Sequence, residues 1–230
     1  MGAQERTGGP ARGDRPPGRW ASFAEELAFH ETLLHRAAPT ATVAVHRGRA
    51  VSFGVGVPPD APYLFRARDA GIPTVRRTSG GSGVLHLEGD LLWAVVLPRS
   101  DPRVGADFTR AYGRLGRGLV TGLAAVGIPA AWAAAPGVAD DYCFLSGRGE
   151  VLSVGGKVVG GAAQHLTSRA LLHHGSVAWE VDRPEIDRLF DLAPGGPSAL
   201  LGGLAGAAGR LDPAAVAEAL TRALDAELAP

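Results

Sequence analysis

The chain has 230 residues, no formal net charge and 46% hydrophobic residues, which fits one soluble globular domain and argues against a nucleic-acid partner. A single cysteine excludes a disulfide framework and a cysteine-based zinc site. It also favours a reducing compartment, so we expect a cytoplasmic protein.

The first forty residues predict a tail followed by a helix. Residues 1–19 mix Arg, Asp, Gly and Pro without an apolar run, so we expect a disordered tail and no export signal. Ser22 and Glu25 have the spacing of a capping box, and apolar residues then recur at helical intervals as far as Pro39. This pattern predicts an amphipathic helix.

The next hundred residues alternate between strand and helix signals. Two β-branched runs, 42–45 and 51–55, predict a hairpin. A short helix over 63–69 and a buried strand over 91–97 follow. A long helix over 104–126 presents one apolar face, which comprises Phe108, Tyr112, Leu115 and Leu119.

Membrane insertion is not expected. The uncharged run 119–139 is long enough to span a bilayer, but it consists mostly of Ala and Gly and is broken by Pro129 and Pro136.

The last hundred residues predict more strands and then helices. Residues 130–181 are mostly strand, 184–191 form a short helix, and 193–209 read as a linker. Asp212 caps a final helix that ends near Leu228. Uneven groups of strands and helices favour an α+β fold with a mixed, mostly antiparallel sheet and helices packed on it. We expect one domain over 20–192, with residues 193–230 as a linker and a helix that packs on it.

One loop carries the features of an anion site. Two arginines precede small residues in Arg76-Arg77-Thr78-Ser79-Gly80-Gly81-Ser82-Gly83-Val84-Leu85-His86. Small residues let backbone N–H groups approach a phosphate or carboxylate, and a guanidinium group neutralises it. Adjacent arginines in extended backbone diverge, so we expect one to face the ligand and the other to pair with a carboxylate. A glycine-rich hairpin with solvated arginines is the alternative interpretation.

A second segment gives the loop a context. Gly155-Gly156-Lys157-Val158-Val159-Gly160-Gly161-Ala162 is followed by His174-Gly175, and Lys157 is the only lysine of the chain. Together the two segments resemble the signatures of the lipoate–protein ligase A family, in the biotin/lipoate ligase superfamily. Ser82 and Gly83 replace the Gly-Ala that is usual in the first signature.

The resemblance implies a fold and a set of functional residues. The fold is the class II synthetase-like catalytic domain of biotin and lipoate ligases, with the acyl group in a tunnel. Lys157 would touch the acyl carbonyl. The residues implied in acyl or nucleotide binding are Arg76, Arg77, Ser79, Gly80, Gly81, Gly83, His86, Gly160, Ala162, His174 and Gly175.

Cys143 decides between mechanisms. Cys143-Phe144, with Glu150 before Lys157, resembles the cysteine-using octanoyltransferases of this superfamily. In those enzymes a cysteine takes an octanoyl or lipoyl group from an acyl carrier protein or another octanoyl donor and holds it as a thioester. The acceptor is a lysine of a lipoyl domain, in a 2-oxoacid dehydrogenase or the glycine cleavage H protein. No cofactor is then needed. Because both groups must reach one acyl carbonyl, we expect Cys143 and Lys157 to border one cavity.

Two alternatives stay open. The chain could be an ATP-dependent lipoate–protein ligase that uses lipoate, ATP and Mg²⁺ through lipoyl-adenylate, with Cys143 as a buried strand residue. It could also be a non-catalytic lipoyl- or acyl-binding paralogue or partner subunit. His165, His173 and His174 form no recognisable metal-ligand spacing, so no resident metal is expected.

Overall fold

Six strands form the main sheet of the computed structural model, which describes residues 22–105 and 108–229. The expected tail, 1–19, lies outside this range. In spatial order the strands are β1 (Thr40–Val45), β5 (Leu91–Pro98), β9 (Ala170–Val177), β8 (Lys157–Leu166), β7 (Glu150–Val154) and β6 (Ala130–Ala134), and every neighbouring pair is antiparallel. A smaller sheet has the order β3 (Thr74–Arg76), β2 (Ala50–Phe53), β4 (Gly83–His86), with β2 and β3 parallel. The expected α+β fold with a mostly antiparallel sheet is confirmed.

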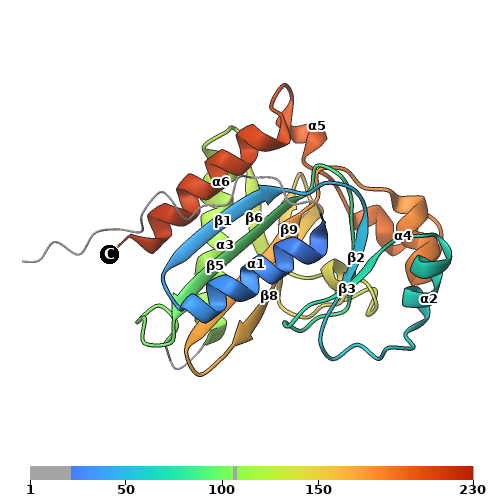
Figure 1. Ribbon diagram of the computed structural model, residues 1–230. Helices are drawn as coiled ribbons and strands as arrows, with labels where there is room; N and C mark the ends of the chain where they lie inside the picture. The colour runs from blue at the N-terminus through green and yellow to red at the C-terminus, as the bar shows by residue number, and fades with distance from the viewer. Residues whose placement is uncertain (1–21, 106–107, 230) are drawn as a thin grey trace, which may run out of the picture.

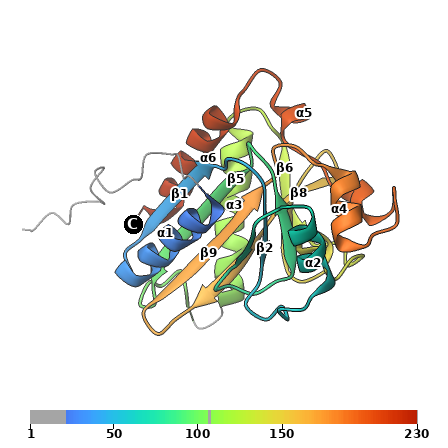
Figure 2. The same ribbon diagram turned by 45° about the vertical axis from the view of Figure 1, so that its right-hand side comes forward.

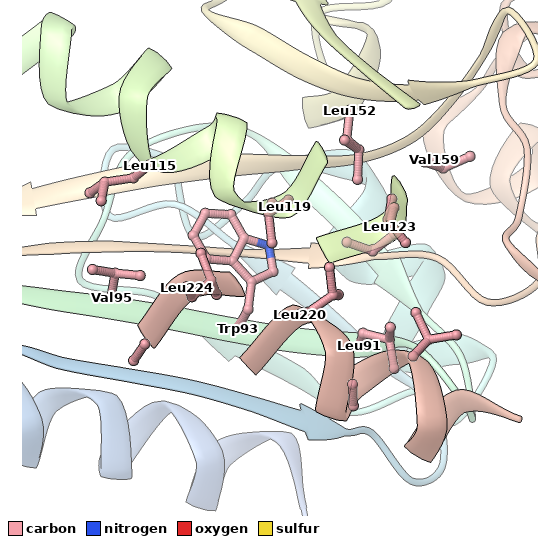
Figure 3. Packing of buried hydrophobic residues seen from close by; sticks show 14 of the residues in the cluster. Leu91, Trp93, Val95, Leu115, Leu119, Leu123, Leu152, Val159, Leu220 and Leu224 are labelled. Carbon is pink, nitrogen blue, oxygen red and sulfur yellow. The ribbon is translucent and has the colours of Figure 1, made fainter. Parts of the chain in front are cut away.

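Helices cover both faces of the main sheet (Figure 1). Strand β5 is buried on both faces, because successive side chains of a strand point to opposite faces of the sheet and both faces are covered by helices. Leu91, Trp93, Val95 and Leu97 point to α3 (Phe108–Ala124) and α6 (Pro213–Leu228), whereas Ala94 and Val96 point to α1 (Phe23–Arg36). Figure 3 shows Trp93, which is fully buried, among the leucines of α3 and α6. This cluster is the main core.

Glycines allow α3 to lie close to its neighbours. A Cβ at Gly122 would stand 2.9 Å from Cα of Leu220 in α6, and one at Gly116 would overlap the ring of Trp132. Close approach therefore outweighs the helix propensity that these glycines lack. The long helix predicted over 104–126 is confirmed as α3, but Val104 and Gly105 precede it in non-helical backbone and the helix ends at Ala124. Leu115 and Leu119 are buried as expected. The side chain of Phe108 lies outside the described part.

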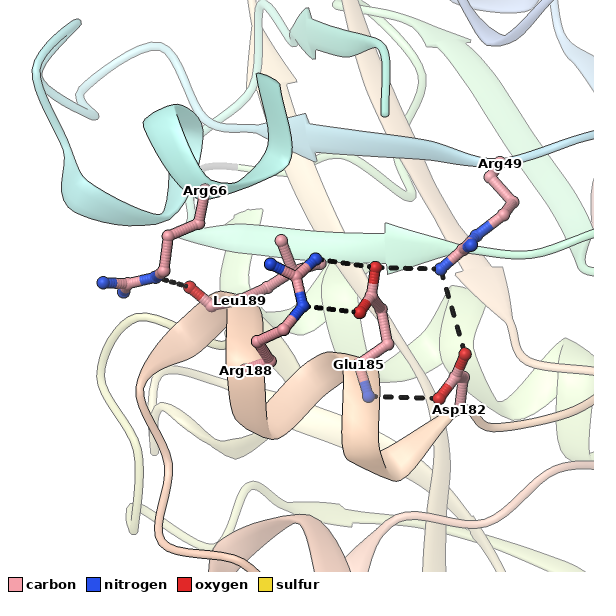
Figure 4. Close-up of polar contacts among 6 residues, drawn as sticks. All are labelled: Arg49, Arg66, Asp182, Glu185, Arg188 and Leu189. Atoms are coloured by element: carbon pink, nitrogen blue, oxygen red, sulfur yellow. Dashed lines mark hydrogen bonds and ion pairs between the residues drawn. The ribbon is translucent and has the colours of Figure 1, made fainter. Parts of the chain in front are cut away.

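The smaller sheet packs with α2 (Pro62–Asp69) and α4 (Arg183–Phe190) on the side of the molecule away from α6 (Figure 2). Polar contacts pin α4 there (Figure 4): Arg66 donates to the carbonyl of Leu189 at 2.6 Å, and Arg49 pairs with Glu185 at 3.1 Å. Such exposed ion pairs contribute little, at most about 1 kcal/mol each. The apolar cluster between α2, α4 and the smaller sheet therefore contributes most of the stability of this packing.

The predicted hairpin over 42–45 and 51–55 is wrong. Both strands exist, but β1 pairs with β5 in the main sheet and β2 pairs with β3 and β4 in the smaller one. The reason lies in burial: all four residues of β2 are buried, so the strand needs partners on both edges. The connecting residues are tied to the turn before β5, because the amide of His46 donates to the carbonyl of Asp90 at 2.7 Å.

The C-terminal segment returns across the main sheet. It comprises a 3-10 turn, η3 (Pro197–Leu200), a short helix, α5 (Ala205–Ala208), and α6, which Asp212 caps as predicted. The amide of Gly202 donates to the carbonyl of Val158 at 2.9 Å, which ties the segment to β8. Within 22–105 and 108–229, no helix has the length and apolarity that crossing a membrane requires.

Candidate functional site

A narrow cavity of about 40 Å³ opens where α1, the two sheets and the 3-10 turn η2 (Cys143–Leu145) meet. Its walls come from one side of α1, from β2 and β4, from η2, and from the middle of β8 and β9. Six residues predicted from the sequence line it: Arg77, His86, Cys143, Ala162, His174 and Gly175. The two signature segments and the cysteine are therefore brought to one place.

Cys143 opens η2 rather than lying in a strand, and its side chain is partly exposed. The turn is fixed against the glycine loop, because the amide of Gly83 donates to the carbonyl of Asp141 at 3.0 Å. Gly81 has a φ of +93°, and a Cβ there would stand only 2.8 Å from Sγ of Cys143. The loop thus needs glycine at this position to leave the thiol in place.

Arg77 is the cation beside the thiol. The same Cβ position at Gly81 is 2.8 Å from Sγ of Cys143 and 3.2 Å from Nη2 of Arg77, so those two atoms are within about 6 Å of each other. The guanidinium group donates to Oγ of Ser52 at 2.6 Å and to the carbonyls of Gly80 and Ser82 at 3.1 and 3.0 Å. Burial lowers the pKa of Arg77, while the neighbouring thiol of Cys143 and phenol of Tyr63 raise it.

The two arginines diverge as expected, but the expected carboxylate partner is wrong. Arg77 points inward and braces the loop through a hydroxyl and two carbonyls. Arg76 is exposed, stacks over the ring of Phe53 at 5.3 Å and donates to the carbonyl of Val57 at 3.4 Å. Backbone carbonyls can replace a carboxylate here because they satisfy the guanidinium hydrogens without a second buried charge.

Two serine–histidine pairs flank Arg77. Oγ of Ser52 lies 2.7 Å from Nε2 of His86, and Oγ of Ser79 lies 2.7 Å from Nε2 of His174. Burial, followed by neighbouring cationic groups that include Arg77, holds the pKa of both histidines well below the usual value. Both imidazoles are therefore neutral at physiological pH.

Helix α1 adds a buried acid–base pair that sequence reasoning missed. Glu26 and His30 line the cavity, are 1% and 4% exposed, and approach to 3.9 Å between Oε1 and Nε2. Burial raises the pKa of Glu26 to about 8 and lowers the pKa of His30 to about 4. The sequence did contain a signal for this pair, because Glu26 and His30 are polar residues on the apolar face of an amphipathic helix.

Lys157 is not among the residues that line the cavity. Its side chain is exposed at the start of β8, and Nζ donates to the carbonyl of Ala199 at 2.7 Å. The expectation that Lys157 and Cys143 border one cavity is thus not met by this conformation, and the role of Lys157 stays a prediction.

Gly160 supports the site indirectly. A Cβ there would stand 2.5 Å from the carbonyl oxygen of Ser176, so the glycine allows β8 and β9 to lie close where both line the cavity. No group of three or more His, Cys, Asp or Glu within 22–105 and 108–229 could hold a metal ion.

Comparison with known proteins gives three kinds of match. Residues 22–198 match the lipoyl protein ligase A/B catalytic domain. The octanoyltransferases LipM of Macrococcus caseolyticus and of Symbiobacterium thermophilum are each 32% identical, over 56% and 59% of this chain and 49% and 51% of theirs. The chain thus spans about half the length of these relatives.

Solved structures agree on the fold. A lipoate-protein ligase A bound with ATP superposes with a TM-score of 0.72 at 21% identity, over 88% of this chain and 79% of that one. A bi-partite lipoate protein ligase of Thermoplasma acidophilum, described with its E2 lipoyl domain, gives 0.69 at 20% identity, over 88% and 78%. With the sequence match over 22–198, these likenesses show that the chain belongs to the lipoyl protein ligase A/B catalytic domain family.

Proposed function

We propose that the chain transfers an octanoyl group to the lysine of a lipoyl domain through a thioester on Cys143. The observation that carries the proposal is the position of Cys143 on the cavity wall, within about 6 Å of a buried arginine. The LipM relatives support octanoyl as the group transferred. An acyl carrier protein is the proposed donor, and no cofactor is consumed.

The first step loads the enzyme. The thiolate of Cys143 attacks the thioester carbonyl of the octanoyl donor, the new C–S bond forms, and the donor's sulfur leaves with the electron pair and takes up a proton. Arg77 stabilises the anionic sulfur and the oxyanion that forms on the carbonyl, because a buried guanidinium acts through a low dielectric. Neutral His86 and His174 add no charge of their own beside the guanidinium group.

The second step unloads it. The neutral amine of the acceptor lysine attacks the Cys143 thioester, the amide forms, and Cys143 leaves as thiolate while the amine gives up a proton to water. Two thioester-level steps need no ATP, because the acyl group arrives already activated. The bi-partite ligase described with an E2 lipoyl domain supports a lipoyl domain as acceptor.

Lys157 enters this proposal through the family resemblance. To touch the acyl carbonyl, its Nζ would have to leave the carbonyl of Ala199. Exchanging one exposed hydrogen bond for water costs only about 1 kcal/mol, so a bound acyl group could draw the ammonium away.

An ATP-dependent ligase is the second candidate, because the fold is shared with a lipoate-protein ligase A that binds ATP. Arg77 and the exposed backbone at Gly80 and Gly81 could then hold the phosphate of an acyl-adenylate. Lipoate, ATP and Mg²⁺ would be substrates, and Cys143 would take no part.

Intact mass spectrometry separates the two candidates. Incubated with octanoyl-carrier protein and no ATP, the protein should gain one octanoyl group, which hydroxylamine removes. Cys143→Ser should gain none. The ligase reading predicts the reverse: no adduct on either protein, and lipoyl-domain modification by Cys143→Ser when lipoate, ATP and Mg²⁺ are supplied. If neither the octanoyl adduct nor the modified lipoyl domain forms, the remaining interpretation is a non-catalytic binding protein.

A further inference from the structure

Arg77 is a buried charge without a carboxylate partner. It is 8% exposed, and its acceptors are the hydroxyl of Ser52 and the carbonyls of Gly80 and Ser82. Among the described residues, no ion pair joins it to an acid. A buried cation of this kind is costly unless an anion meets it, and the thiol of Cys143, on the cavity wall within about 6 Å, is a group that can become that anion.

A hydrogen-bonded row lies behind Arg77. A guanidinium can only donate, so Oγ of Ser52 accepts from Nη1 at 2.6 Å. The same oxygen lies 2.7 Å from Nε2 of His86. Burial holds the pKa of His86 well below its usual value, so the imidazole is neutral.

Asp90 lies on the far side of His86. Its Oδ2 is 3.9 Å from Nδ1, which is too far for a hydrogen bond, and the carboxyl group is anchored by the amides of Leu87 and Trp179 at 3.1 and 2.9 Å. The ring of Phe23 stacks on the imidazole with a centroid distance of 4.3 Å. Ser52, His86 and Asp90 are all at most 3% exposed, so the row cannot turn toward water.

We propose that Ser52, oriented by His86, is a positioning residue that aims the guanidinium group of Arg77 at the sulfur of Cys143. The Ser52 hydroxyl is the only side-chain acceptor of Arg77 in the described structure; the other two acceptors are the main-chain carbonyls of Gly80 and Ser82, in the loop that borders the thiol. This proposal rests on the proposed thioester mechanism, because only that mechanism needs a reactive thiolate. The effect of Ser52 on the thiol of Cys143 can nevertheless be measured without any acyl transfer.

The test uses the single cysteine. Because Cys143 is the only thiol, intact mass after iodoacetamide treatment reports on it and on nothing else. We expect Ser52→Ala to slow alkylation about tenfold at pH 7, because an opposite charge within 4–6 Å favours an ionised form by about one to three decades. At high pH, where every thiol is ionised, the two proteins should react equally fast.

Two further variants make the result specific. Ser198→Ala removes another fully buried hydroxyl, far from Arg77 in the chain, and should match the wild type at every pH. Arg77→Met removes the cation, and adding Ser52→Ala to it should slow alkylation no further, because the serine acts only through the arginine. If Ser52→Ala does not fold, His86→Phe removes the serine's hydrogen-bond partner and should shift the pH profile in the same direction.

Three results would overturn the proposal: a Ser52→Ala profile that superimposes on that of the wild type, slowing by the same factor at all pH values, or additive effects in the double variant. Slowing by the same factor at all pH values would indicate changed access of iodoacetamide to the thiol rather than a changed thiol pKa. No acyl donor is present in these measurements, so they fail independently of the proposed transfer. Conversely, a normal alkylation pattern without any octanoyl adduct would remove the transferase function and leave the positioning role intact.

Discussion

Gly81 is the residue at which backbone conformation and the proposed chemistry meet. Its φ of +93° suits glycine, and any Cβ would press on the sulfur of Cys143. We expect Gly81→Ala to lower the rate of octanoyl loading at least tenfold while the protein still folds. The measurement is loading by intact mass, with Gly56→Ala as control, because Gly56 has open space around its Cβ position. Equal rates of octanoyl loading in Gly81→Ala and the wild type would show that the loop at Gly81 takes no part in the reaction.

Lys157 tests the contribution of the family resemblance. If its ammonium stabilises the oxyanion on the acyl carbonyl, Lys157→Arg should keep the charge yet lose about 2.7–4 kcal/mol of transition-state stabilisation, the range for one oxyanion donor. Steady-state transfer to a lipoyl domain measures this loss. Full activity would mean that the ammonium stays at the carbonyl of Ala199 throughout the reaction.

The sequence predicted these site residues unevenly. Arg77, His86 and His174 were found because the two signature segments carry them, and Cys143 because Cys143-Phe144 resembles the cysteine-using octanoyltransferases; all four line one cavity. Ser52 was missed as a functional residue because nothing local distinguishes it: its role arises from Arg77, which lies 25 residues away and reaches it through the pairing of β2 with β3 and β4.

At the scale of elements, helices were predictable and strand partners were not. Caps at Ser22, Asp182 and Asp212 are local signals, and each accepts the backbone N–H that a cap residue should. The pairing of β1 with β5 joins residues that are 46 to 56 positions apart in the chain, from Val45 with Leu91 to Thr40 with Val96. A turn-like tetrapeptide between two β-branched runs therefore predicted a hairpin that tertiary packing overrides.

The contact between α3 and α6 gives a prediction for stability. Alanine is a better helix former than glycine by about 1 kcal/mol, but a Cβ at Gly122 would stand 2.9 Å from backbone of α6. We expect Gly122→Ala to lower the free energy of unfolding by about 1–3 kcal/mol, the usual cost of overpacking. Urea unfolding measures it. A more stable Gly122→Ala would show that the helices can separate at no cost.

At the scale of the whole molecule, buried histidines make the fold sensitive to acid. Burial lowers the pKa of His30 to about 4 and of His173 to about 3, and it also lowers the pKa of His46, His86 and His174. As the pH falls below about 6.5, the unfolded chain binds protons that the folded chain cannot, so stability is lost.

Two buried carboxyl groups act in the opposite direction. The pKa of Glu26 is raised to about 8 and that of Asp90 to about 7, so these groups stabilise the fold as the pH falls through those values. Five histidines outnumber two acids, and we expect the free energy of unfolding to drop by a few kcal/mol between pH 7 and pH 5. Urea midpoints at the two pH values test this, and an unchanged or higher midpoint at pH 5 would contradict it.

A single-turnover chase tests the central claim, transfer through Cys143, most directly. The octanoylated protein is isolated, mixed with unmodified lipoyl domain without ATP, and both masses are followed with time. The mechanism predicts that the octanoyl group leaves Cys143 and appears on the lysine of the lipoyl domain, at a rate no slower than steady-state turnover. An octanoyl group that stays on Cys143 while turnover continues would contradict it.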